Sequence, residues 1–174
     1  MRLSKLDAAK RQLETAIRLW FHAGDPVSAH TLAAASHQVL HDLAKRSGLG
    51  TILRGAAYVR PEHRKEYARM LSSYENFFKH ADKDPDKLLE FNPVATEMFL
   101  FDAVFTYQAL TTEIPPLMGT FKIWALIHYP YIRDETAKTL FNSLPYGTEN
   151  AWKDMEKGAF LGSFMPIALK TGTV

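Results

Sequence analysis

With 174 residues, of which 47% are hydrophobic, the chain can form one domain with a substantial core but is short for two, because domains commonly contain about 100 to 150 residues. It contains no cysteine, which excludes a disulfide framework, a thiolate zinc site and a cysteine nucleophile. Its net charge of +2 is far from the clustered basic excess of a dedicated nucleic-acid binder.

The first predicted element is an amphipathic helix that begins near Ser4 and ends near Gly24. Ser4 and Asp7 have the spacing of a capping box. Apolar residues then recur at helical intervals: Leu6, Leu13, Ile17 and Trp20. Charges interrupt this stretch too evenly for a signal peptide, and no apolar run approaches the roughly 18 residues that cross a bilayer. We therefore expect a cytoplasmic protein with no membrane partner.

A second helix is predicted to begin at Asp25-Pro26, an N-cap followed by proline at the first helical position, and to end near Arg46. On a helical wheel, its apolar stripe consists of Leu32, Val39 and Leu43. Three histidines fall on the opposite face: His30, His37 and His41. We expect these histidines to face away from the core.

The third and fourth helices also begin with proline signals. The third runs from Pro61 to about Ala81, with a helical rhythm of apolar residues. The fourth follows Asn92-Pro93, ends before Pro115-Pro116 and is apolar on nearly all sides. Its aromatic residues cannot all face one interior: Phe99, Phe101, Phe105 and Tyr107. Some of them should therefore be covered by the C-terminal extension or by a second copy of the chain, and we predict a homodimer.

The last third of the chain predicts less regular structure. A fifth helix is expected in "PLMGTFKIWALIHYP", and two shorter ones in "DETAKTLFNSL" and "TENAWKDMEKG". The predicted fold is all-α. It consists of an antiparallel four-helix bundle over residues 1–112 and a short helical extension over residues 113–174, which packs on the bundle or on a dimer partner.

Asn76 and His80 are candidate catalytic residues at the end of the third helix. The wheel places both opposite the stripe that contains Tyr74 and Phe78. Histidine titrates near neutral pH and can transfer a proton, while an amide can hold a phosphate. Such a pair can cleave RNA, because the substrate's own 2′-hydroxyl is the nucleophile. The sequence contains no Ser-His-Asp pattern, Walker loop or dinucleotide fingerprint.

The polar residues around the second helix allow other interpretations. His37 and His41, at i and i+4, can bind one ion together with Asp42 or Glu75. There is no HExxH motif, and we predict neither a metal nor a cofactor. Alternatively, the histidines are surface residues or form a polar dimer seam. Residues 41 to 69 contain seven Lys or Arg and three acids, which predicts a phosphate-facing edge or a solvated corner.

The stretch "ENFFKH" resembles the ribonuclease motif of the HEPN superfamily, in which an arginine is followed, after four to six residues, by a histidine. Family members commonly carry Asn, Asp or His directly after the arginine. Asn76 aligns with that polar position and His80 with the motif histidine, while Glu75 replaces the arginine. Residues 1–112 as a whole look like a family of uncharacterised bacterial HEPN-like proteins.

The resemblance implies a helical bundle that dimerises, so that two motifs share a cleft. In active members the arginine neutralises phosphate charge in the transition state, whereas Glu75 would repel phosphate unless Lys79 or another cation compensates. We therefore expect an RNA- or nucleotide-binding protein whose metal-independent ribonuclease activity is degenerate. Its candidate binding residues are Glu75, Lys79, His37 and His41. The alternatives are a non-catalytic dimeric helical interaction module with a partner protein, and a histidine-based metal-binding protein.

Overall fold

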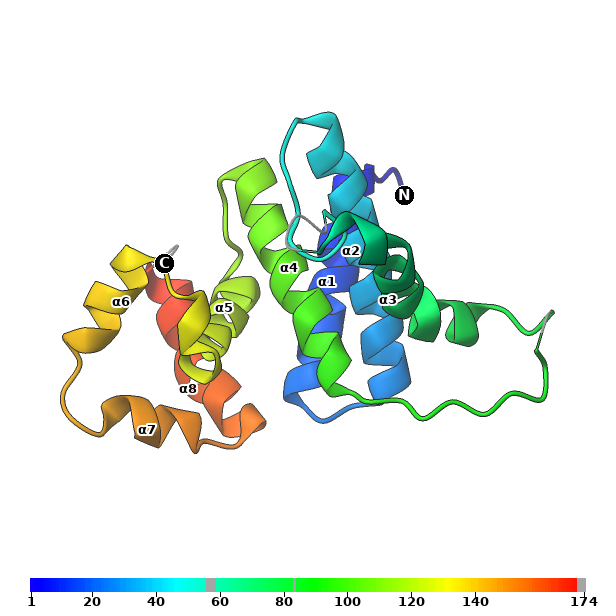
Figure 1. The fold of residues 1–174 in the computed structure, drawn as a ribbon. Coiled ribbons are helices and arrows are strands. Elements are labelled where there is room, and N and C mark those ends of the chain that lie inside the picture. The colour runs from blue at the N-terminus through cyan, green and yellow to red at the C-terminus, as the bar shows by residue number, and fades with distance from the viewer. Residues whose placement is uncertain (56–58, 83, 172–174) are drawn as a thin grey trace.

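A computed structural model describes residues 1–55, 59–82 and 84–171, and every regular element in these ranges is helical (Figure 1). The all-α prediction is confirmed. The helices are α1 (Lys5–Phe21), α2 (Pro26–Arg46), α3 (Arg64–Lys79), α4 (Val94–Thr111), α5 (Pro116–His128), α6 (Glu135–Asn142), α7 (Thr148–Lys153) and α8 (Lys157–Thr171), with short 3-10 helices η1 (Pro61–His63) and η2 (Pro130–Ile132). Among these helices, none combines the length and the apolar character needed to span a membrane.

The first two helices have the ends that the sequence predicts. The Ser4 hydroxyl accepts a hydrogen bond from the Asp7 N–H at 3.0 Å, and the Asp7 carboxylate accepts one from the Ser4 N–H at 3.0 Å, which completes a capping box. Asp25 caps α2 by accepting a hydrogen bond from the Ser28 N–H at 2.8 Å. Gly48 follows α2 with a φ of +73°, a left-handed conformation that glycine adopts without a steric penalty.

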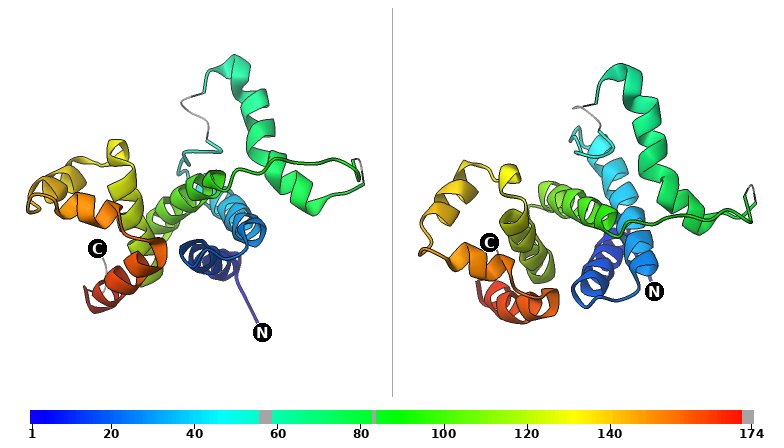
Figure 2. Two further views of the ribbon diagram at one scale, coloured as in Figure 1. Left: turned by 90° about the horizontal axis from the view of Figure 1, so that it is seen from below. Right: turned by 60° about the horizontal axis from the view of Figure 1, so that its bottom comes forward.

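Helices α1, α2 and α4 pack against one another and form the N-terminal core. The fourth N-terminal helix, α3, contacts α2 and contributes no fully buried side chain. Figure 2 shows α3 at the edge of the molecule, away from α1. A compact four-helix bundle therefore stays a prediction, because three helices share the core and α3 lies beside it.

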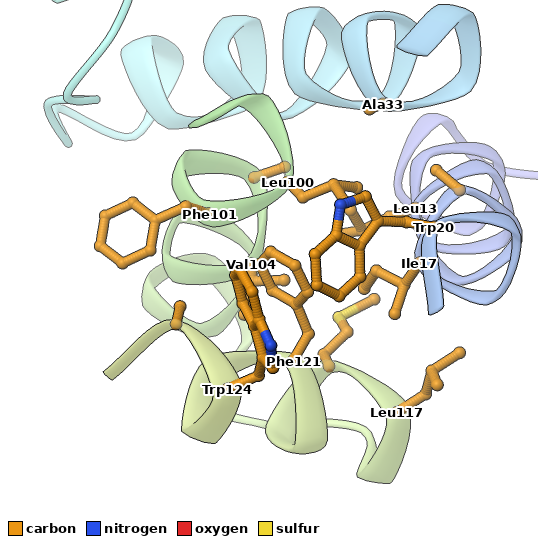
Figure 3. Close-up of a cluster of buried hydrophobic side chains, with 14 of the residues drawn as sticks. Leu13, Ile17, Trp20, Ala33, Leu100, Phe101, Val104, Leu117, Phe121 and Trp124 are labelled. Atoms are coloured by element: carbon orange, nitrogen blue, oxygen red, sulfur yellow. The ribbon is translucent and has the colours of Figure 1, made fainter. Parts of the chain in front are cut away.

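The centre of the core lies where α1, α4 and α5 meet (Figure 3). The Trp20 ring meets the rings of Trp124 and Phe121 edge to face, with centroids 4.4 and 5.3 Å apart. Phe101 points away from this cluster, on the other side of α4 (Figure 3). Phe99, Phe101 and Tyr107 are buried within the chain and Phe105 is half-buried, and α5 supplies part of the cover. Their burial therefore does not require a second copy, and the homodimer stays a prediction.

Helices α5 to α8 lie on the opposite side of α4 from α3 (Figures 1 and 2). Helix α5 packs against α8 as well as against α1 and α4. Glu97 of α4 also connects to this side, because it accepts a hydrogen bond from the Tyr129 hydroxyl and pairs with Lys157 at 3.5 Å. The C-terminal helices thus share the core of the N-terminal ones.

Two elements differ from the sequence expectations. Helix α3 ends at Lys79, two residues before the expected end, because the backbone of His80 is extended, with φ −132° and ψ 131°. Helix α8 was not predicted, since two glycines and Pro166 lie within it and argue against a helix by propensity. Tertiary packing outweighs this: the Phe160 ring stacks on Phe21, with centroids 6.2 Å apart, and is fully buried.

Candidate functional site

The histidine-bearing face of α2 is its buried face, so the expected orientation of this helix was wrong. His30 and His37 are both 0% exposed, whereas the stripe of Leu32, Val39 and Leu43 is only half-buried. The reason is the size of the neighbouring residues. Several alanines share the histidine face, and small side chains allow α1 and α4 to approach closely.

Asp102 of α4 anchors His37 and the loop that follows α2. Its carboxylate accepts hydrogen bonds from His37 Nε2 at 2.7 Å and from the backbone N–H groups of Ile52 and Leu53 at 3.0 and 2.9 Å. Burial alone would raise the pKa of Asp102, but these three hydrogen bonds outweigh it and hold the pKa below its ordinary value. Asp102 is therefore an ionised carboxylate at neutral pH.

Arg54, in the loop after α2, extends these contacts to α3. Its Nε donates to His37 Nδ1 at 3.3 Å, and its Nη2 donates to the Glu75 carboxylate at 3.1 Å. Because Nδ1 of His37 accepts a hydrogen bond, it carries no proton. The ring nitrogen of His37 that donates to Asp102 is therefore Nε2.

Glu75 holds two cations at once. One oxygen accepts from Arg54, and the other accepts from Lys79 Nζ at 2.5 Å, one helical turn further along α3. Burial raises the pKa of Glu75, but Lys79 and Arg54 together lower it below its usual range. We call the connected side chains Asp102, His37, Arg54, Glu75 and Lys79 the Arg54 network. The structure thus joins three predicted binding residues, His37, Glu75 and Lys79.

A pocket of about 390 Å³, here called the Arg54 pocket, opens beside this network between α2 and α3. Its charged lining residues are Arg54, Arg64 and Asp42, so its net charge is positive. The fourth predicted binding residue, His41, also lines it, and His41 Nδ1 lies 2.7 Å from the Thr51 hydroxyl. Burial lowers the pKa of His41 below its ordinary value.

Asn76 and His80 lie elsewhere. Both are exposed at the C-terminal end of α3 and face away from the core, as the helical wheel indicates. They line a separate pocket of about 510 Å³, to which Asp82, Asp84 and Lys87 also contribute. Lys87 pairs with Asp84 at 3.4 Å, so the acidic charge of Asp82 has no such partner among the other lining residues. A phosphate would meet more negative than positive charge here.

The histidines of α2 bind separate partners rather than one ion. In the described part of the chain, no three His, Asp or Glu side chains come together in a group that could hold a metal. Both ring nitrogens of His37 are used, by Asp102 and by Arg54. The ring of His30 is surrounded by aromatic side chains.

Sequence reasoning missed two residues of this site. Asp102 is a single acid within the apolar stretch "FLFDAVF", and such an isolated charge on a buried helix signals that a partner must exist. Arg54 is one of the seven basic residues counted between residues 41 and 69, but nothing in the sequence singles it out, because it lies in a loop without periodic structure.

Comparison of the chain with protein-family models, with curated proteins and with solved structures found no match. Its function is therefore inferred from the residues and contacts described above.

Proposed function

We propose that this chain is a HEPN-like, dimeric helical protein that binds RNA or nucleotides through their phosphate groups at the Arg54 pocket. One observation carries the proposal: the guanidinium of Arg54 contacts Glu75, which takes the place of the motif arginine in the family that the sequence resembles. A cation from the loop after α2 thus contacts the residue that stands at the motif's arginine position in the sequence. The four-helix arrangement of α1 to α4 is part of the proposal.

The contacts of Arg54 prepare it for an anionic ligand. Asp102 orients His37, His37 accepts from Nε of Arg54, and Glu75 accepts from Nη2, so the planar guanidinium is held from two sides. A side chain that is already ordered loses little conformational entropy when it binds a ligand. Arg64 adds a second guanidinium at the rim of the pocket, and arginine suits the geometry of phosphate.

Arg64→Gln is expected to weaken binding of a short fluorescent oligoribonucleotide about tenfold, because a hydrogen bond to a charged group contributes roughly 1.5 to 3 kcal/mol. Fluorescence anisotropy at several salt concentrations measures this, and the salt dependence should also decrease by about one phosphate contact. Competition with AMP or ADP distinguishes a nucleotide site from an RNA site.

Arg69→Gln is the matched control for this experiment. Arg69 is exposed on the same helix, and it is not among the residues that line the Arg54 pocket. An equal loss of affinity in both variants would mean that only the overall charge matters. Absence of any binding by the unaltered protein would contradict the proposal itself.

Ribonuclease activity at Asn76 and His80 is expected to be absent or weak, because Asp82 lies in their pocket and phosphoryl transfer requires positive charge near the phosphate. His80→Ala should change stability by less than about 0.5 kcal/mol, since His80 is exposed. Incubation with a mixed RNA pool, together with thermal unfolding, measures both effects. Cleavage by the unaltered protein that disappears in His80→Ala would establish that this pair is catalytic after all.

A second candidate function, a dimeric interaction module, is favoured by an exposed apolar surface beside α4. Ile52, Met98 and Tyr131 are 45%, 40% and 78% exposed, and they line a groove of about 440 Å³ together with Phe101 and Phe105. Exposed apolar clusters of this kind commonly mark protein interfaces. A stable dimer without affinity for RNA or nucleotides would favour this function over the first.

A further inference from the structure

A further cavity, of about 380 Å³, lies among the C-terminal helices, far from the residues of the Arg54 pocket in sequence. Its walls are mainly apolar side chains from α5 to α8, among them Leu126, Phe141, Trp152 and Phe164. Phe141 and Phe164 are each 8% exposed, so these walls are fixed parts of the core. The volume falls in the range of about 300 to 1,000 Å³ that is typical of small-molecule sites.

Lys122 of α5 brings a positive charge to this apolar cavity. Its Nζ donates to the Gln108 side-chain oxygen at 3.1 Å and lies 5.3 Å from the centre of the Phe105 ring. Among the described residues, no carboxylate comes within 4.0 Å of it. Burial lowers the pKa of Lys122, although Asp134 opposes this. The ammonium thus has a neutral hydrogen-bond partner and no ion pair.

Asp134 is the other charged residue that lines the cavity. It is exposed and caps α6, where its carboxylate accepts a hydrogen bond from the Ala137 N–H at 2.8 Å. Water and the positive end of the helix dipole therefore stabilise this carboxylate without Lys122. Neither charge forms an ion pair among the described residues, but Asp134 is exposed and caps α6, whereas Lys122 is half-buried and has only a neutral partner.

We infer that this cavity binds a small apolar carboxylic acid, of the class of medium-chain fatty acids. The carboxylate would pair with Lys122 Nζ, and the hydrocarbon would lie against Leu126, Phe141 and Phe164. A charged hydrogen bond at a partly dehydrated ammonium and the burial of hydrocarbon both favour binding. This activity is additional to the phosphate binding proposed above, and it does not depend on it.

Isothermal titration calorimetry with octanoate and with octan-1-ol tests the inference. The two probes share a hydrocarbon chain and differ in charge, so the unaltered protein should bind octanoate at least about tenfold more tightly. Lys122→Met keeps most of the length of the side chain and removes its charge. It should weaken octanoate binding at least about tenfold and change octanol binding by less than about twofold.

Lys138→Met is the matched control, because Lys138 is exposed on α6, outside the residues that line the cavity, and its removal changes the net charge equally.

Gly119→Leu tests the cavity without touching Lys122. Gly119 lines the cavity, and a Cβ there meets only the Ile114 side chain, at 4.0 Å, so a side chain can start there without a clash. A leucine that occupies the cavity should abolish binding of both probes.

Thermal unfolding followed by circular dichroism verifies that each variant is folded. If Lys122→Met fails to fold, the comparison of the two probes on the unaltered protein and on Gly119→Leu still decides. The inference is overturned if octanoate does not bind, if octanol binds equally well, or if Gly119→Leu retains full affinity. It is also overturned if Lys122→Met retains full affinity for octanoate or if Lys138→Met loses as much.

Discussion

Asp102→Ala is expected to lower the free energy of unfolding by about 3 to 5 kcal/mol, the largest effect of any substitution considered for this chain. Asp102 is 1% exposed, and its carboxylate accepts three hydrogen bonds. Alanine would leave the Nε2–H of His37 and the N–H groups of Ile52 and Leu53 without an acceptor. Urea unfolding at pH 7, followed by circular dichroism, measures the loss.

Two further variants show whether the lost hydrogen bonds cause this effect. Asp102→Asn keeps the shape and one acceptor oxygen, and should therefore destabilise less than alanine. Asp86→Ala removes an exposed acid from the loop before α4 and should change the free energy of unfolding by less than about 0.5 kcal/mol. A loss below about 1 kcal/mol for Asp102→Ala would mean that water replaces the carboxylate, and that the loop is not held by it.

Acidification from about pH 6.5 to pH 4 is expected to destabilise the protein through His30. Its Nδ1 lies 3.1 Å from the Thr96 hydroxyl, while its buried Nε2 has no hydrogen-bond partner. Four aromatic rings surround the imidazole, those of Tyr74, Phe78, Phe91 and Phe99. Burial lowers the pKa of His30 to about 4, although Glu75 opposes the shift.

The sign of the effect follows from the proton balance. Below about pH 6.5 the unfolded chain binds a proton at His30 that the folded state does not bind, so stability falls as the pH falls. The decrease ends near the folded pKa of about 4, below which both states are protonated. Because each unit of pKa difference corresponds to about 1.4 kcal/mol, the total is about 3 kcal/mol.

The double variant His30→Leu/Thr96→Val isolates this contribution. It replaces both polar partners by apolar side chains, a change that can be nearly neutral in a well-packed core. Acid also protonates carboxylates with lowered pKa values, such as Asp102 and Glu75. This destabilises the unaltered protein and the double variant alike. Urea unfolding between pH 7 and pH 4 should therefore show that the unaltered protein loses about 3 kcal/mol more stability than the variant, so that the two curves separate on acidification. Parallel curves would contradict the role of His30.

The ends of the first two helices could be predicted from neighbouring residues, whereas the buried face of α2 and the presence of α8 depend on tertiary packing. Caps and prolines located the first two helices, because the groups that end a helix are neighbours in sequence. The buried face of α2 could not be found in this way. A helical wheel predicts that the face with the largest apolar side chains is buried. In the folded chain, α1 and α4 instead pack against the face of α2 on which alanines permit close contact. Helix α8 was missed because packing outweighs its glycines and Pro166.

The candidate site, too, could be predicted only in part from local sequence. Polar residues of α2 and α3 could be chosen from the sequence, and Glu75 and Lys79 do bond to each other, as residues one turn apart on a helix can. The partner that connects them to α2 is Arg54, 21 residues before Glu75 and in a loop. No local rule predicts which loop residue reaches a given carboxylate. The contact between Arg54 and Glu75 forms only when α3 docks on α2, so it depends on the tertiary structure.

The peripheral position of α3 has a consequence for the dynamics of the protein. Because this helix contributes no fully buried side chain and contacts mainly α2, it should open at a lower free energy than the other large helices, and its amide protons should exchange with solvent first. Tyr67, Ala68 and Leu71 of α3 form one wall of the Arg54 pocket. A ligand in that pocket would bind only while α3 is docked. Ligand binding would therefore slow the exchange of amide protons along the whole of α3.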